Sequence, residues 1–381
     1  MARDINKSKF DKGTNLKLDI FRECFKEWFP VLANDQYTQK LFIYDLFAGS
    51  GTDNEGEYGS PLVLLEEARG SNNEFCHFVE KKEKDISFIF NENKNAKAKK
   101  LEENINDYIQ ECEKNCSFGE CVYKDKIEIK NDNFIDVFKN SDFDVILNDK
   151  KYGKFLLLDQ YGFKEIGDKV FCKLITYPKT DFIFFIASNY VKRFKTLPAV
   201  TDYFQKIGNI NFDESKPKEC HRIIAEYFKQ LIPTGKEYYL HHFSYLKKTN
   251  YYGLIFGTNH TYGMEKFLDV CWKHAPHSGE STENIDNDHE IGTLFYNPSN
   301  SNKKQKIKSS LEKEILSSTI KTNVEGFKFV LSNGCQTSLY IECIENLINT
   351  KKVYIDGKFN KQKASIHKLK GDKIYNIIVN Q

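Results

Sequence analysis

The 381-residue chain lacks any long apolar run. Its longest ones, such as Phe182–Ala187, are far shorter than the stretch of about 20 residues that a membrane-spanning helix needs. The first residues include Arg3, Asp4 and Lys7 and lack the apolar stretch of a signal peptide. These absences predict a cytoplasmic protein without transmembrane segments.

The sequence also lacks the features of a disulfide-stabilised protein. Its 10 cysteines are scattered over a long chain without an export signal, so we expect reduced thiols. Cys112, Cys116 and Cys121 form a C-x3-C-x4-C pattern. A zinc ion there would need a fourth ligand from elsewhere, such as Cys76 or His77. The alternative is a set of unrelated thiols in an insertion, and we predict no metal site.

The composition is that of a globular protein with an uneven charge distribution. Hydrophobic residues make up 40% of the chain and charged residues 29%, which excludes wholesale disorder. Residues 301–381 hold 15 Lys, no Arg, and 7 Asp or Glu, a balance of +8, whereas the whole chain carries +2. A basic C-terminal unit on a mildly acidic body favours contact with phosphates, although general lysine richness is the simpler explanation.

Short apolar runs alternate with amphipathic stretches along the body of the chain. The expected strands are 41–47, 74–79, 126–129, 154–158 and 181–187, followed by a hairpin of 238–246 and 251–257. The expected helices are 17–32, ending near Pro30, then 61–68, 170–175, 220–231 and 264–272. Strands that alternate with helices predict a parallel sheet with crossover connections. The closing hairpin favours the doubly wound, Rossmann-like α/β sheet of class I methyltransferases.

The last part of the chain predicts a separate small domain. Residues 275–302 are rich in His, Ser, Glu, Asn and Asp and are typical of a linker. The expected elements beyond it are helices 310–319, 323–331 and 337–349 and strands 352–356 and 373–379. Three helices and a β wing are the elements of a winged helix. We therefore expect a body over 1–274, a linker over 275–302 and an α+β winged-helix domain over 303–381.

The first motif with chemical content is IYDLFAGSGT at residues 43–52. Its pattern, D-x-F-x-G-x-G, comprises Asp45, Phe47, Gly49 and Gly51 and matches the loop that binds S-adenosylmethionine (AdoMet). Glycine lets the backbone approach a ligand closely, and open α/β sheets bind ligands at the carboxyl ends of their strands. A tight structural turn is the alternative explanation for two glycines.

Two further acidic residues are candidate cofactor ligands. Glu80 is expected to end the second strand, where a carboxylate can accept both ribose hydroxyls of an adenosine ligand. Asp132 follows the third strand and would accept from the adenine amino group. For Glu80, a solvated pair with the neighbouring Lys81 is the simpler alternative.

The end of the fourth strand carries the candidate catalytic residues. Asp159 and Tyr161 stand where base-modifying amino-methyltransferases place an amine-holding acceptor and a stacking aromatic residue. Stacking matters because a base in a duplex must first be flipped out of the helix. Gln160 occupies the position of a proline and removes its backbone restriction. An ordinary strand end with polar caps is the alternative.

Taken together, the chain resembles the three-Cys-motif partner protein (TcmP) family over nearly its whole length. The resemblance rests on KLDIFRECFKEWFPVL, YDLFAGSGTDNEGEYGSPLVLLE, FLLLDQYGF, YYGLIFGTNHTYGMEKFLDVCW and the winged-helix tail. It implies a scaffold similar to AdoMet-dependent methyltransferases and a partner that looks like a radical-SAM protein. The name refers to cysteines of that partner. The family commonly has D-P-Y-G where this chain has Asp159, Gln160, Tyr161 and Gly162.

Two functions follow as expectations. The first is an AdoMet-dependent methyltransferase that acts on nucleic acid, in which alignment of the sulfonium and the nucleophile can suffice without a strong base. DNA would be contacted through the basic C-terminal domain. The second is a non-catalytic partner or scaffold protein, in which the winged helix docks DNA or protein. Gln160 favours the second function, whereas the intact glycine loop favours the first.

Overall fold

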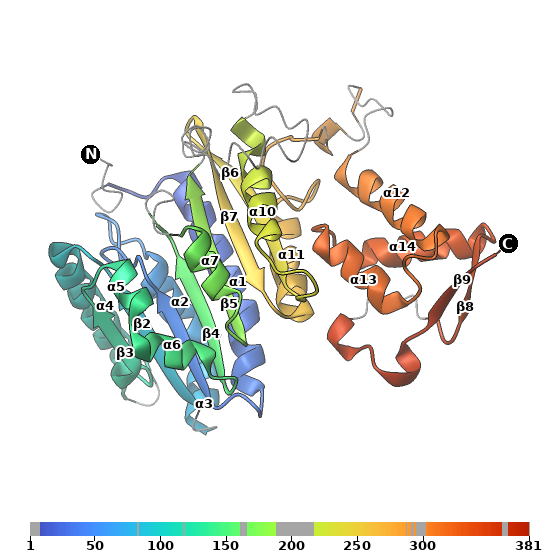
Figure 1. The fold of residues 1–381 in the computed structure, drawn as a ribbon. Helices are drawn as coiled ribbons and strands as arrows, with labels where there is room; N and C mark the ends of the chain where they lie inside the picture. The colour runs from blue at the N-terminus through green and yellow to red at the C-terminus, as the bar shows by residue number, and fades with distance from the viewer. Residues whose placement is uncertain are drawn as a thin grey trace.

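The computed structural model describes residues 8–81, 84–116, 119–160, 166–187, 217–286, 288–290, 293–294, 302–359 and 365–380. They form a seven-stranded sheet with helices on both faces and a second unit with a two-stranded sheet (Figure 1). None of the described helices combines the length and the apolar character that crossing a membrane requires.

The large sheet has the strand order β3-β2-β1-β4-β5-β7-β6. Its strands are β1 (Lys40–Asp45), β2 (Asp85–Asn91), β3 (Ile127–Lys130), β4 (Tyr152–Leu158), β5 (Thr180–Ala187), β6 (Tyr239–Lys247) and β7 (Asn250–Thr258). The first five run parallel, and β7 is antiparallel to both β5 and β6. The predicted doubly wound α/β sheet is confirmed. The carboxyl ends of β1 to β5 therefore meet at one edge, where such sheets bind ligands.

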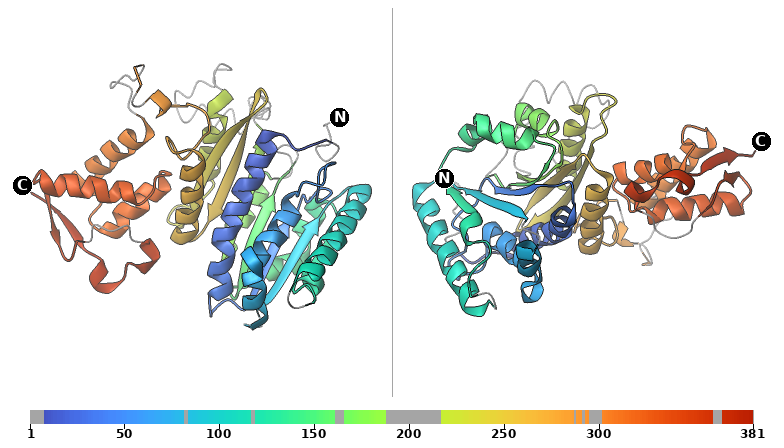
Figure 2. Two further views of the ribbon diagram at one scale, coloured as in Figure 1. Left: turned by 180° about the vertical axis from the view of Figure 1, so that it is seen from behind. Right: turned by 90° about the horizontal axis from the view of Figure 1, so that it is seen from below.

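Helices cover both faces of the sheet (Figure 2), and a hydrophobic layer on each face holds them against it. One face carries α1 (Lys12–Asn34), α2 (Ser60–Arg69), α3 (Glu74–Lys81), α4 (Asn95–Asn115) and α11 (Thr261–His274). The other carries α5 (Phe134–Lys139), α6 (Ser141–Asn148), α7 (Asp168–Leu174) and α10 (Cys220–Gln230). Within β1, Ile43 belongs to the first layer and Tyr44 to the second, since successive strand residues point to opposite faces. A sheet buried on both faces explains its nearly continuous apolar strands.

Helix α1 continues beyond the proline that was expected to end it. Pro30 lies inside the helix, which runs to Asn34, so the predicted end was wrong. Proline removes a backbone hydrogen bond, but the apolar stripe continues past it with Ala33, which is 2% exposed. The side chain of Asn34 also donates to the carbonyl of Pro30 at 2.7 Å. Packing on the sheet thus outweighs the local cost of the proline.

The strand expected at Glu74–Val79 was wrong, because these residues belong to helix α3. Buried Cys76 and Val79 are three residues apart, the spacing of one helical face. The second strand is β2, in which Ile86, Phe88 and Phe90 are all buried. These three residues alternate along the strand and point to the same face of the sheet.

The C-terminal unit contains three helices and two strands in the predicted order, although its first helix begins at Lys303 rather than at 310 and its last strand begins at Asn376 rather than at 373. These are α12 (Lys303–Leu316), α13 (Asn323–Ser332), α14 (Ser338–Asn349), β8 (Val353–Asp356) and β9 (Asn376–Val379), with β8 and β9 antiparallel. The unit packs against α11: the indole nitrogen of Trp272 donates to the Gly334 carbonyl at 3.2 Å, and Gln336 donates to Asp269 at 2.8 Å. The body and the C-terminal unit are thus in direct contact.

Part of the expected linker is also packed against the body. Of its described residues, Glu280 is 2% exposed and Ser281 is fully buried, and Ser281 pairs with Ser244 of β6. The Glu280 carboxylate accepts hydrogen bonds from the guanidinium of Arg222 in α10. It also lies 3.4 Å from the ammonium of Lys303 in α12. A buried carboxylate needs such partners. This network joins the sheet, α10 and the C-terminal unit.

We expect Gly334→Ala to lower the free energy of unfolding by about 3 kcal/mol or more. Gly334 has φ +71°, and a Cβ there would lie 2.1 Å from the imidazole Cε1 of His241. Gly371→Ala is the matched control, because its φ is +57° but nothing lies within 4 Å of the added Cβ. The free energy of unfolding of that variant should fall only by the cost of a left-handed backbone, roughly 1 to 2 kcal/mol. Urea denaturation measures both, and equal losses would contradict the tight packing of Gly334 on β6.

Candidate cofactor-binding site

The carboxylate of Asp45 fixes the loop that follows β1. Asp45 is fully buried, and one oxygen accepts the backbone N–H of Phe47 at 3.1 Å. The other oxygen accepts the hydroxyl of Ser60, the first residue of α2, at 2.5 Å. The side chain therefore ties the end of β1 both to the loop and to the start of the next helix.

The loop needs glycine at two positions. Gly49 and Gly51 have φ values of +66° and +81°, in the left-handed region that other residues adopt only with strain. A Cβ on Gly51 would also come within 2.9 Å of Leu101 in α4. The Gly51 carbonyl accepts the N–H of Gly59 at 2.7 Å, which closes the loop onto the start of α2. These contacts give the turn at the sheet edge one ordered conformation.

Glu92 is the acidic residue that follows β2, and sequence reasoning missed it. Its carboxylate accepts the N–H of Gly49 at 3.1 Å and that of Lys94 at 2.8 Å, and the residue is 6% exposed. Each carboxylate oxygen has a second lone pair, so Glu92 can still accept hydroxyl groups of a ligand. The available signal was its position directly after the alternating apolar run DISFIFN.

Glu80 does not occupy this position. It is an exposed residue of α3, which precedes β2, so it lies toward the opposite edge of the sheet from the glycine loop (Figure 1). The proposed contact of Glu80 with ribose depended on a strand that does not exist. The geometry that was expected of Glu80 is instead found at Glu92.

Asp132 and Phe47 lie at the same edge as the glycine loop. Asp132 follows β3, its side chain is exposed, and its backbone exchanges two hydrogen bonds with the buried side chain of Asn91, at 3.0 and 3.1 Å. Phe47 stacks on Phe134 with ring centroids 5.0 Å apart. These contacts align the ends of β1, β2 and β3.

Asp159 lies at the end of β4 but is already paired. Its carboxylate forms a salt bridge with the ammonium of Lys17 from α1, and the two side chains are 15% and 7% exposed. Gln160 is 1% exposed; its amide donates to the Phe185 carbonyl at 3.4 Å and its oxygen accepts from Ile166 at 3.3 Å. Gln160 therefore links Ile166 to β5. Tyr161 lies outside the described residues.

The buried position of Asp45 perturbs its titration. Burial and, to a smaller extent, the nearby charge of Asp159 raise its pKa to about 7, although the hydrogen bonds from Ser60 and Phe47 and the charge of Lys17 oppose the shift. A cation that binds beside a carboxyl group with a raised pKa lowers that pKa and favours the ionised form. The arrangement suits a positively charged ligand.

One cluster of described side chains has the residue types of a metal site. Among the described residues, His221, His242 and Glu280 place ligand atoms within 4.8 Å of one another. Arg222 and Lys303 already supply positive charge to the Glu280 carboxylate, which disfavours a further cation there. The cluster acts instead as the buried link between the body and the C-terminal unit.

Among the described side chains, Cys112, Cys116 and Cys121 do not form a metal-binding group; the side chain of His77 lies outside them. Burial raises the pKa of Cys76 to about 12, and the three other thiols add to this effect, so Cys76 does lie near them. The group of metal-ligating side chains that the described residues bring together contains none of these thiols.

Comparisons with known proteins give methyltransferases as structural neighbours. No protein-family model and no curated protein matches the sequence. A precorrin-6y C5,15-methyltransferase from Geobacter metallireducens matches with a TM-score of 0.30 and 10% identity, covering 68% of this chain and 97% of its own. A human methyltransferase 10 domain containing protein matches with a TM-score of 0.30 and 10% identity, covering 64% and 83%. Similarities this low establish neither a family nor a ligand, so function rests on the site itself.

We expect Asp45→Asn to change the pH dependence of stability. With a folded pKa near 7 and an unfolded one near 4, the unfolded state loses its proton first as pH rises. Wild-type stability therefore falls between pH 4 and 7 through this group, and the asparagine variant lacks that loss. Relative to wild type, the variant should gain about 2 kcal/mol between pH 5 and 7 in urea denaturation. Parallel pH profiles would contradict the buried carboxyl.

Proposed function

We propose that the chain is an AdoMet-dependent methyltransferase of class I type and a member of the three-Cys-motif partner protein family. The observation that carries the proposal is the ordered turn at the end of β1, in which buried Asp45, positive-φ Gly49 and Gly51, and Glu92 converge. The sequence pattern of this turn resembles the AdoMet loop, and the strand order places it where doubly wound sheets bind nucleotides.

Each polar group of this edge has a role in the proposed complex. Glu92 would accept the ribose hydroxyls, and Asp132 would accept the adenine amino group. The backbone at Gly49 and Gly51 would lie against the methionine part. AdoMet carries a sulfonium and an ammonium group, so its binding would favour the ionised form of Asp45. Bound there, AdoMet supplies an electrophilic methyl group.

The protein would act on the substrate mainly by alignment. Transfer from a sulfonium needs the nucleophile in line with the methyl group and shielded from water, and alignment alone lowers such barriers substantially. Asp159 would hold a substrate amine in exchange for its contact with Lys17. The proposed stacking of a flipped base on Tyr161 falls outside the described residues.

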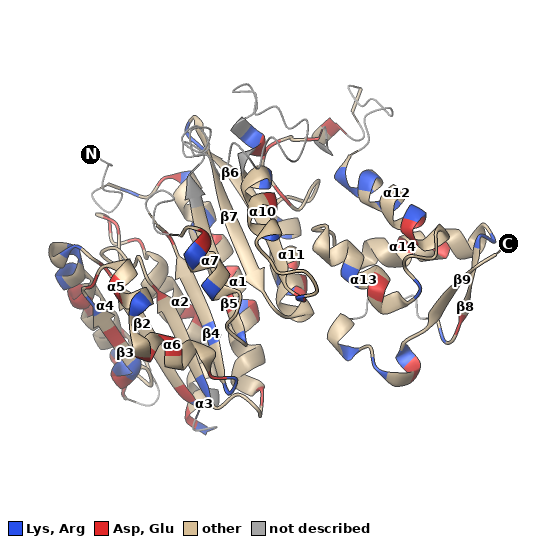
Figure 3. Cartoon of the chain, viewed as in Figure 1, with Lys and Arg blue, Asp and Glu red and all other residues tan. Residues whose placement is uncertain are grey.

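Nucleic acid is the proposed substrate class, held by the C-terminal unit as a winged helix. In a winged helix the third helix, here α14, would be the recognition helix, but it contains no Lys or Arg and its exposed side carries Glu342. The exposed lysines lie elsewhere in the unit, on α12 and around the small sheet (Figure 3). They include Lys304, Lys313, Lys351, Lys352, Lys368, Lys370 and Lys373. Contacts to phosphates would therefore come from the wing and α12, with little reading of base sequence.

A non-catalytic scaffold is the second candidate function. The observation that favours it is the buried salt bridge of Lys17 with Asp159, which occupies the carboxylate that a substrate amine would use. Gln160 at the proline position points the same way. In this case the C-terminal unit would dock DNA or protein, and the family resemblance would supply a radical-SAM-like partner.

We expect Glu92→Gln to weaken AdoMet binding by about 1 to 3 kcal/mol, which is roughly 5- to 150-fold in Kd. The amide keeps the shape of the side chain but loses the charge that strengthens its hydrogen bonds to hydroxyl groups. Isothermal titration calorimetry measures the change. Glu80→Gln is the control: Glu80 is exposed on α3, so its Kd should equal that of wild type.

A stability measurement separates binding from folding in this experiment, because Glu92 also holds Gly49 and Lys94. Urea denaturation of the same samples shows whether Glu92→Gln remains folded at the titration temperature. An unchanged Kd in a folded Glu92→Gln variant, or a loss in Glu80→Gln equal to that in Glu92→Gln, removes Glu92 from the site.

We expect methyl transfer to depend on Asp159. With radiolabelled AdoMet and mixed DNA and RNA, Asp159→Asn should lower incorporation by about 10- to 1000-fold, since the amide holds a substrate amine less well. Asp142→Asn, an exposed residue at the start of α6, is the control and should retain wild-type incorporation. Full incorporation by Asp159→Asn contradicts the assignment. AdoMet binding without incorporation into any nucleic acid favours the scaffold function.

A further inference from the structure

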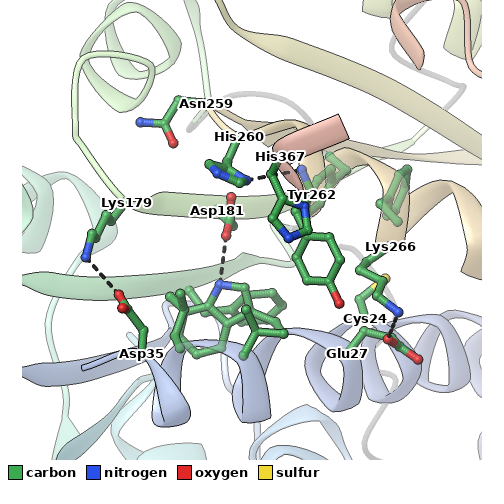
Figure 4. Close-up of a pocket in the computed structure, with 17 residues that line it drawn as sticks. Cys24, Glu27, Asp35, Lys179, Asp181, Asn259, His260, Tyr262, Lys266 and His367 are labelled. Carbon is green, nitrogen blue, oxygen red and sulfur yellow. Dashed lines mark hydrogen bonds and ion pairs between the residues drawn. The ribbon is translucent and has the colours of Figure 1, made fainter. Parts of the chain in front are cut away.

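A second cavity lies at the opposite edge of the sheet from the glycine loop. Its volume is about 500 Å³, within the range of small-molecule sites. It opens between the second half of α1, the start of β5, the start of α11, and His367 of the C-terminal unit (Figure 4). Since Asp181 is at the amino end of β5, the cavity is separate from the proposed cofactor site.

Aromatic side chains form much of the cavity wall. Trp28 and Phe155 pack with ring centroids 5.2 Å apart on one side. Phe256 and Phe267 stack at 4.5 Å, and Tyr262 lies at the mouth beside His367. Flat apolar walls of this kind suit a planar ring, and their π faces attract positive charge.

Asp181 is the polar group set among these rings. One carboxylate oxygen accepts the indole N–H of Trp28 at 2.7 Å. The other lies at the start of α11, where a Cβ on Gly263 would be 3.4 Å from it, and the Thr258 hydroxyl also donates a hydrogen bond to the carboxylate. Burial raises the pKa of Asp181 to about 6, so the group is still largely ionised at neutral pH. Figure 4 shows the carboxyl group between α1 and His260.

The remaining carboxylates of the cavity are already neutralised. Asp35 pairs with Lys179 at 3.1 Å, and Glu27 pairs with Lys266 at 2.6 Å. Among the described residues, Asp181 forms no salt bridge within 4.0 Å; the cation that acts on it, Lys154, donates its ammonium to the Asp149 carbonyl instead.

The two histidines at the mouth add no positive charge. Burial lowers the pKa of both His260 and His367, so both rings are neutral at pH 7. The net charge facing the cavity is therefore the single negative charge of Asp181.

We propose that this cavity binds a second ligand, a planar aromatic ring that carries a cationic N–H donor. The donor pairs with Asp181, and the ring lies against Trp28, Phe256 and Phe267. Asp181 is half-buried and lacks a salt-bridge partner among the described residues, so such a ligand supplies both a paired charge and apolar surface. Because His367 belongs to the C-terminal unit, the ligand bridges the two parts of the molecule.

Benzamidinium is the probe, and benzoate of the same size and opposite charge is its control. Calorimetry on the full chain should give a benzamidinium Kd of about 1 mM or below, and at least about tenfold weaker binding of benzoate. Benzamidinium should also change the fluorescence of Trp28, and the change should be absent in Trp28→Phe. Equal affinity for the two probes, or no benzamidinium binding at about 10 mM, overturns the proposal.

Two variants test the role of Asp181 directly. Asp181→Asn keeps an acceptor for the Trp28 indole and should weaken benzamidinium binding by about 10- to 100-fold. Glu27→Gln changes a carboxylate of the same cavity that is already paired and should alter the Kd by less than about threefold. If Asp181→Asn binds benzamidinium with the wild-type Kd, or if Glu27→Gln loses as much affinity as Asp181→Asn, the site is not built around Asp181. If Asp181→Asn does not fold, Asp181→Glu takes its place. It keeps the charge but moves the carboxylate by about one bond, so it should weaken benzamidinium binding by less than about tenfold.

Discussion

The burial of one carboxylate, that of Asp45, is the constraint on which the proposed cofactor site depends. A buried carboxylate must find donors close by, and it finds them in the backbone of Phe47 and the hydroxyl of Ser60. Satisfying Asp45 therefore forces the chain to turn immediately after β1 and to begin α2 beneath the turn. Glu92 then holds the same turn from β2. The shape of the sheet edge follows from these few hydrogen bonds.

Helix α1 connects the two ends of the molecule. Near its start, Lys17 pairs with Asp159 at the edge that carries the glycine loop. Three turns later, Trp28 donates to Asp181 at the opposite edge. Both interactions use polar groups on the face of α1 that packs on the sheet. The same helix thus sets the position of a candidate catalytic carboxylate and one wall of the second cavity.

Sequence reasoning predicted the elements that have strong local patterns and missed what depends on distant contacts. The strand before the glycine loop and the hairpin were predictable, because apolar period and turn residues are local signals. Glu80 was predicted to end the second strand because the aromatic and apolar residues of α3 resemble a strand when only composition is counted. The pairing of Lys17 with Asp159 joins residues 142 positions apart, and no local pattern encodes it. The same holds for Pro30, whose helix is maintained by packing on the sheet.

Titration of the full-length wild-type chain with AdoMet tests the central claim most directly. The turn built by Asp45, Gly49, Gly51 and Glu92 predicts saturable binding of one AdoMet per chain. Competition by S-adenosylhomocysteine should follow, because the ribose and adenine contacts are common to both molecules. The absence of any saturable heat at neutral pH, with the protein shown to be folded, would contradict a cofactor site at this edge and leave the turn as a purely structural feature.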